Sequence, residues 1–248
     1  MINVAVAEAL FALILLVMAY FISHTINGAL QAFIIDKLGD STAKKEGYMS
    51  LMPFNHFDTF GFLALILLGI GWLQTVPIDP YSFIGKLRYL RLLLAFATEA
   101  LVSILLATTS LFLAVYFFGY TLTHLLVYTL FMYYSKISLI FFSKAATLNI
   151  SALFSESDSS LAIAIAFLLV SLVYLNIVIA TISTIYNAFR YFLVVGFEQG
   201  YSYIEYADYL AILGPFLVVF VFGELLLRYL LMLTDWGAGQ IAFLFGAF

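Results

Sequence analysis

Long apolar stretches, separated by short groups of charged and polar residues, constrain the fold of this chain more than any other feature. Five of them meet or approach the roughly 20 residues that a helix needs to cross about 30 Å of hydrocarbon. They occupy residues 4–35, 89–118, 120–143, 161–193 and 207–232. The first and fourth exceed a simple span, so we expect them to tilt, kink or extend past the lipid. The pattern predicts a polytopic membrane protein.

The composition leads to the same class. Hydrophobic residues make up 65% of the chain and charged residues 10%, with a mean hydropathy of +1.11, which excludes an ordinary soluble domain. Because backbone polar groups in lipid must be bonded internally, we predict an all-α helical bundle of five or six membrane segments. The connections are too short to fold alone, so we predict a single transmembrane domain over residues 1–248. We expect the first stretch to be a retained helix rather than a cleaved signal peptide, because it lacks a basic leader and a clear cleavage site.

A sixth apolar run, from Phe60 to Leu73, is only about 14 residues long and reaches roughly 21 Å. Basic residues lie on both of its flanks, and short basic loops tend to remain cytoplasmic. Flanks on one side of the membrane would make this run a re-entrant or compact helix, and the sequence leaves open whether it crosses. The flanking residues are Lys37, Lys44 and Lys45 before the run and Lys86, Arg88 and Arg91 after it.

Charge and cysteine content exclude several partners and chemistries. The net charge of −4 includes no basic arm or acidic tail, so the sequence does not point to a nucleic-acid partner. The absence of cysteine excludes disulfides, thiolate metal sites and a cysteine nucleophile. The partners we expect are the lipid bilayer and other membrane-protein subunits.

Ionisable side chains inside a bilayer are costly, and each is a candidate functional residue. Glu99, Arg190, Glu224 and Arg228 fall in the apolar runs. Glu224 and Arg228 stand four residues apart with the acid first, which favours an ion pair within one helix. Glu99 has no such partner in its own helix and is expected to face Arg190 across the bundle.

The three histidines, His24, His56 and His124, lie in or near different membrane segments. Two of them facing each other from adjacent helices could ligate haem or another metal. A histidine held by hydrogen bonds in a structural role is the more common arrangement, and the sequence alone does not separate the two.

Residues 22–80 carry a resemblance to a known family. The chain contains a Leu38-Gly39-Asp40 turn followed by Thr42-Ala43, and a later segment with Leu51, Pro53, His56, Asp58 and Gly61. Next comes Gly-Trp-Leu-Gln-Thr-Val-Pro-Ile-Asp-Pro over residues 71–80. In order and spacing these segments resemble those of the site-2 proteases, a family of intramembrane zinc metalloproteases. Members of that family carry HExxH on a helix, followed by a Leu-Gly-Asp-x-Thr-Ala turn and a Leu-Asn-Pro-x-x-His-x-Asp-x-x-Gly segment. A Gly-Trp-Ala-Lys-Pro-Val-Pro-Val-Asn-Pro segment comes later in their chains. The specificity lies in their joint spacing.

The catalytic residues of that family do not carry over. Against HExxH, His24 matches the first ligand, but Thr25 stands for the glutamate and Gly28 for the second histidine. The family's third ligand is an aspartate in Pro-Pro-Leu-Asp-Gly, and the corresponding region, Ser183 to Phe192, contains no aspartate. The family's Gly-Pro-x-x-Asn element is blurred around Ala97 to Ala100. Threonine is no general base at neutral pH and glycine has no side-chain ligand, so the resemblance implies a degenerate, proteolytically inactive relative.

From this we predict a non-catalytic, site-2-protease-like protein that acts as a structural or accessory subunit of a larger membrane complex. We assign no catalytic residue, no metal ligand and no cofactor; the zinc alternative has His24, His56 and Asp58 as weak candidate ligands. We expect Thr25, Gly28, Tyr186 and Tyr191 to close the former catalytic cavity. An active protease with rearranged zinc ligands and a small transporter or channel subunit are the alternatives. The resemblance implies the inner (cytoplasmic) membrane of a bacterium.

Overall fold

The computed structural model describes residues 4–137, 160–196, 229, 232–234 and 236–244. Within these ranges the regular structure is helical, as the sequence predicts. The elements are α1 (Val4–Leu38), α2 (Thr42–Lys45), η1 (Pro53–His56), α3 (Thr59–Leu68), η2 (Pro80–Ser82), α4 (Arg88–Ile137) and α6 (Ser160–Gly196). Residues 236–244 are also helical.

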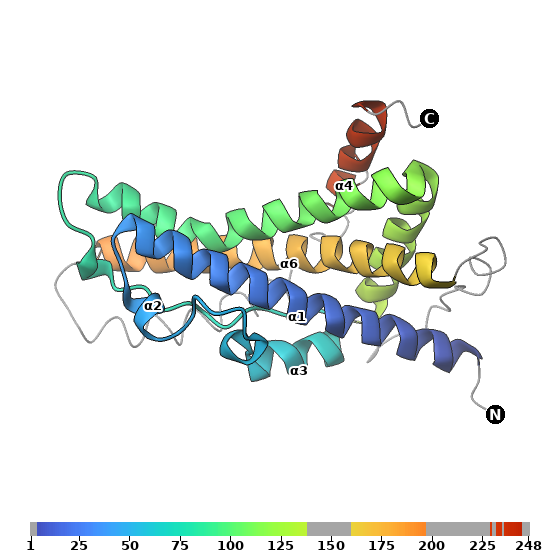
Figure 1. The fold of residues 1–248 in the computed structure, drawn as a ribbon, viewed down its shortest axis with the longest axis horizontal. Coiled ribbons are helices and arrows are strands. Elements are labelled where there is room, and N and C mark those ends of the chain that lie inside the picture. Colours follow the sequence, from blue (N-terminus) through green and yellow to red (C-terminus); the bar gives the residue numbers. More distant parts are fainter. Residues whose placement is uncertain (1–3, 138–159, 197–228, 230–231, 235, 245–248) are drawn as a thin grey trace.

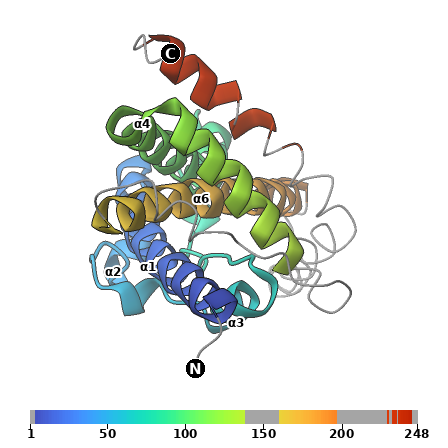
Figure 2. The ribbon, with the colours of Figure 1, turned by 90° about the vertical axis from the view of Figure 1, so that its right-hand side faces the viewer.

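The long helices α1, α4 and α6 lie along one another and define the long axis of the molecule (Figure 1). α1 and α6 run in the same direction and α4 runs against them; Figure 2 shows the three packed together when seen from one end. Residues Leu10–Leu38, Arg88–Leu130 and Leu161–Gly196 are long and apolar enough to cross a membrane. These three helices indicate an integral membrane protein; the predicted segment 207–232 lies almost wholly outside the described residues.

α4 changes direction at Gly119, where the chain turns away from the bundle axis (Figure 1). Gly119 has φ 77° and ψ 165°, a conformation that residues with a side chain rarely adopt. The break falls between the predicted segments 89–118 and 120–143, so the glycine separates the two apolar runs.

The main core lies between α1 and α6. Its large, fully buried side chains include Tyr20, Phe167 and Tyr174, and Ala12 and Ala19 of α1 are buried among them. Small residues at a helix contact let the backbones approach closely, which is the usual way in which membrane helices pack. Tyr174 also donates a hydrogen bond to the Gly69 carbonyl at 3.1 Å, which joins α6 to the end of α3.

α3 is shorter than the apolar run from Phe60 to Leu73. Its N-cap is Asp58, whose carboxylate accepts the Gly61 N–H, and it ends where Gly69 takes a left-handed φ of 70°. Its 10 residues reach about 15 Å, too little to cross the hydrocarbon. After Gly69 the chain returns, without regular structure, to the end of the molecule at which α1 stops and α4 starts (Figure 1). α3 is therefore a compact helix whose two basic flanks lie at one end of the bundle.

Asp40 joins the two connections at that end. Its side chain is fully buried, one carboxylate oxygen accepts the Thr42 N–H at 2.9 Å and the other accepts the Asp79 N–H at 2.7 Å. The turn after α1 and the proline-containing segment before η2 are thereby held together, and the segment from Gly71 to Val76 is laid against α1.

Candidate functional site

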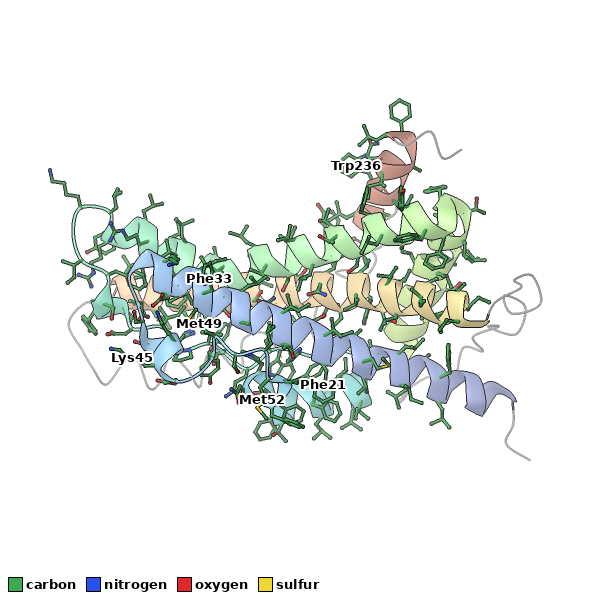
Figure 3. The ribbon with its side chains drawn as sticks, in the orientation of Figure 1. Phe21, Phe33, Lys45, Met49, Met52 and Trp236 are labelled. Carbon is green, nitrogen blue, oxygen red and sulfur yellow. The ribbon has the colours of Figure 1, made fainter. Side chains whose placement is uncertain are left out.

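The residues that resemble a protease motif lie on two neighbouring faces of α1. His24 and Gly28 are four residues apart and so share one face, while Thr25 lies next to them. The Thr25 hydroxyl donates a hydrogen bond to the Phe21 carbonyl at 2.8 Å, back along its own helix. Phe21 itself packs on Phe57 and Phe62, beside α3 (Figure 3). Thr25 therefore presents no basic group where a protease would hold its glutamate.

His24 is buried against the returning segment. Its Nε2 atom is 2.9 Å from the carbonyl oxygen of Trp72, and its ring lies on that of Tyr20 with the centroids 3.4 Å apart. The Tyr20 hydroxyl is within hydrogen-bond distance of both the Trp72 and Asp58 carbonyls, at 3.3 and 3.2 Å. A carbonyl oxygen only accepts, so Nε2 of His24 carries the proton and its lone pair is on Nδ1.

His56 fills the space that Gly28 leaves open. Its ring atoms Cε1 and Cγ lie 2.8 and 2.9 Å from the point that a Cβ atom on Gly28 would occupy, and Nδ1 lies closer still. His56 is 2% exposed, and its Nε2 atom is 2.9 Å from the Ser50 carbonyl. By the same reasoning as for His24, its lone pair is on Nδ1. A larger side chain at position 28 and the present position of His56 exclude each other.

The three candidate ligands of a substitute metal site have other structural roles. His24 and His56 each hold a backbone carbonyl through Nε2, and Asp58 caps α3. Across the described ranges, no three His, Cys, Asp or Glu side chains come together in a way that could hold a metal ion. In both buried histidines Nε2 is engaged with a backbone carbonyl, and haem ligation stays an untested alternative. His124 lies on α4, its ring 5.6 Å from that of Tyr120.

The region that corresponds to the family's third ligand is an unbroken part of α6. The Ser183 hydroxyl donates a hydrogen bond to the Ala180 carbonyl of the same helix. The Tyr186 ring contacts the guanidinium of Arg190, and the Tyr191 ring contacts that of Phe96. Beside Gly28 it is the His56 ring that occupies the space; the closing role expected of Thr25, Gly28, Tyr186 and Tyr191 stays a prediction.

A row of buried polar side chains crosses the interface of α1, α4 and α6. Asn176 donates to the Ser23 hydroxyl at 2.8 Å, and Asn27 donates to the Ser103 hydroxyl at 2.6 Å and to the Glu99 backbone carbonyl at 3.2 Å. Asn187 donates to the Glu99 carboxylate at 3.1 Å. We call this set the polar seam; it consists of Ser23, Asn27, Glu99, Ser103, Asn176 and Asn187, all less than 9% exposed.

Several buried acceptors in and beside the polar seam lack a donor. Among the residues that the structure describes, the buried Oδ1 atoms of Asn27 and Asn176 have no hydrogen-bond partner, and neither do the Nδ1 atoms of His24 and His56. All four atoms are acceptors, since the amide NH2 groups and the Nε2–H groups are already used. Leaving one buried acceptor unpaired costs about 1–3 kcal/mol, a large share of the stability of a typical domain.

The intramembrane charges that the sequence singled out divide into two groups. Glu99 and Arg190 lie on facing helices, and the positive charge of Arg190 acts on the Glu99 carboxylate. The guanidinium carbon lies 5.2 Å from the centre of the Phe96 ring, one turn before Glu99. Glu224 and Arg228 lie outside the described residues, so their expected ion pair stays a prediction.

Asn27, Ser103 and Asn187 were missed by reading charges and histidines alone. The available signal was polar spacing inside apolar runs, because Ser23 and Asn27, like Glu99 and Ser103, stand one helical turn apart. Uncharged polar residues in membrane helices commonly bond to a neighbouring helix.

Comparisons with known proteins give a partial match. The chain is 35% identical over 68 residues to the "Putative zinc metalloprotease YwhC" of Bacillus subtilis (strain 168). The match covers 27% of this chain and 31% of that relative, so the chain spans about a third of its length. No family model and no solved structure matches. The match supports a relationship to site-2-protease-like proteins over part of the chain.

Proposed function

We propose that this chain is a site-2-protease-like membrane protein that does not hydrolyse peptide bonds and acts through its helical scaffold. The observation that carries this proposal is the ring of His56 in the space above Gly28. In the family pattern a second zinc ligand stands at that helix position, and here another side chain already takes the volume that it would need.

The residues present do not fit a catalytic zinc ion. Such a site needs three protein ligands, an open position for water and a neighbouring general base. Nε2 of His24 is engaged with the Trp72 carbonyl, the Thr25 hydroxyl is bonded within its helix, and position 28 has no side chain. The described part of the chain gathers no third ligand.

The same scaffold suits an accessory role in a membrane complex. The side chains of the polar seam are buried, while large apolar side chains such as Leu101, Leu105 and Tyr116 of α4 are more than half exposed. Such a surface suits lipid, and it also suits the apolar face of another membrane helix, where close packing rather than hydrophobicity drives association. We propose that the chain works as a non-catalytic subunit of a larger assembly.

A cleavage assay tests the catalytic part of this proposal. The full-length chain is expressed in membranes with a set of single-span reporter proteins, next to His24→Ala and the control His124→Ala. We expect the parent to cleave no more reporter than His24→Ala does. Cleavage by the parent and by His124→Ala, but not by His24→Ala, would show an active protease.

Purification in mild detergent tests the accessory part. We expect the tagged chain, isolated from its native membranes, to carry other membrane proteins in whole-number stoichiometry. A particle with the mass of one chain and its detergent would contradict the assignment as a subunit.

A further inference from the structure

The polar seam has a consistent chemical character along its length. Ser23 and Asn27 are one turn apart on α1, about 6 Å along the axis. Asn176 and Asn187 are just over three turns apart on one face of α6, about 16.5 Å. Because α1 and α6 run in the same direction and α4 against them, the contacts follow in order. They pass from Asn176 and Ser23, through Asn27 and Ser103, to Glu99 and Asn187.

Two amide oxygens in the polar seam accept no hydrogen bond from the residues that the structure describes. The NH2 groups of Asn27 and Asn176 are used on Ser103, on Ser23 and on backbone carbonyls, which leaves both Oδ1 atoms as buried acceptors with nothing to accept. Asn27 and Asn176 are both 0% exposed. The backbone carbonyl partners determine the orientation of each amide, so turning an amide over would only exchange one unpaired atom for another.

We propose that the polar seam binds ordered water molecules deep inside the bundle, which donate hydrogen bonds to the Oδ1 atoms of Asn27 and Asn176. Water is the donor that reaches buried sites of this kind, and it is retained where several polar groups converge. The serine hydroxyls that accept from the two amide NH2 groups, and the Glu99 carboxylate one turn from Ser103, are the polar groups that offer a buried water additional partners.

The cation of the facing helix is directed toward aromatic rings rather than toward the two amide oxygens. Arg190 is the cation on the facing helix, and its guanidinium lies over the Phe96 and Tyr186 rings. Gln31, 2% exposed and one turn beyond Asn27, continues the polar row toward the end of the bundle at which the loops lie. Bound water would keep a polar environment around Glu99 in a part of the molecule that is otherwise apolar, with or without protease activity.

The cysteine-free sequence permits a direct test. A single introduced cysteine supplies the only S–H group, and its infrared stretching band is replaced by that of S–D in D2O only where water reaches the sulfur. We choose Ser23→Cys and Ser103→Cys as positions in the polar seam. The controls are Ala19→Cys and Ala107→Cys, each one turn away on the same helix and also buried.

The full chain of each variant is placed in lipid nanodiscs. We expect the S–H band to disappear at least about tenfold faster in Ser23→Cys than in Ala19→Cys, and likewise in Ser103→Cys than in Ala107→Cys. Local opening of the bundle would instead expose all four positions alike. Equal exchange at polar-seam and control positions would overturn the proposal. Thermal unfolding of each variant before the exchange shows that the bundle is intact. The two positions lie on different helices, so each tests the proposal without the other.

Discussion

The imidazole ring of His56 stands on the backbone of Gly28, where any Cβ atom would overlap it. Residues 28 and 56 are thus matched in volume across the contact between α1 and η1, and neither can be enlarged alone. The contact also buries Nδ1 of His56.

We therefore expect Gly28→Ala to destabilise the chain by about 1–3 kcal/mol, the usual cost of overpacking a well-filled interior. The preference of a helix for alanine over glycine offsets a part of this. Unfolding in a denaturing detergent, followed by circular dichroism, measures the change. Gly196→Ala is the control, because a Cβ atom there meets nothing within 4 Å. Adding His56→Ala to Gly28→Ala should recover much of the lost unfolding free energy, because the smaller side chain makes room for the new Cβ atom. Purely additive effects of the two substitutions would contradict a direct contact between residues 28 and 56.

Asp40 is expected to require its carboxylate. Both of its partners, the N–H groups of Thr42 and Asp79, are donors, so Asp40→Asn turns an amide NH2 toward one of them. We expect a loss of about 1–3 kcal/mol and faster proteolysis of residues 39–58 in limited digestion. Asp36→Asn is the control, since Asp36 pairs at 3.3 Å with Lys44, whose side chain is more than half exposed, and such surface pairs contribute little to stability. Equal digestion of the two variants would argue against a special role of Asp40.

Asn187 is expected to stabilise the buried Glu99 carboxylate. Asn187→Leu removes the donor at 3.1 Å and should cost about 1.5–3 kcal/mol, as for hydrogen bonds to charged groups. The loss should be smaller when Glu99→Gln is already present, because the side chain that lacks its donor is then neutral. A double-mutant cycle in unfolding free energy measures the difference. A coupling energy near zero would show that the hydrogen bond contributes nothing to stability.

Substitution of Gly119 is expected to lower the stability of the chain because of the backbone conformation at this position. Its φ of 77° and ψ of 165° belong to a region that only glycine occupies readily, so Gly119→Ala should cost about 1–3 kcal/mol although the space around it is open. A fall in the unfolding temperature, without a change in helix content by circular dichroism, is the expected result. Unchanged stability would mean that the turn in α4 does not need this conformation.

The sequence predicted best those features that depend on neighbouring residues in the chain. The apolar runs predicted α1 and α6 nearly to their ends, and the Gly119 break within α4 falls between two predicted segments. The apolar run from Phe60 to Leu73 was predicted to be short, but α3 ends before the run does, at Leu68. Gly69 closes α3 by a left-handed turn, and the sequence beyond it is just as apolar as the helix. A pattern of hydropathy does not distinguish a helix from an extended segment that packs on one.

In the candidate site, too, residue identities were predictable from the sequence and contacts between distant residues were not. Which residues stand at positions 24, 25 and 28 of α1 was readable directly. That His56 packs against Gly28, and that Asn27, Ser103 and Asn187 meet around Glu99, depends on residues far apart in the chain. Such contacts are determined by how three helices and a returning segment pack, which no spacing within one helix encodes.

By itself, the amino-acid sequence determined that this chain belongs in lipid and that α1 does not carry the protease motif in full, because apolar length and residue identity at single positions are one-dimensional properties. Only the tertiary structure decided which side chain packs against Gly28 and where the buried polar groups find their partners. The reason is physical: volume and hydrogen bonds in a bundle interior must be satisfied between segments, and those segments come together only when the chain has folded.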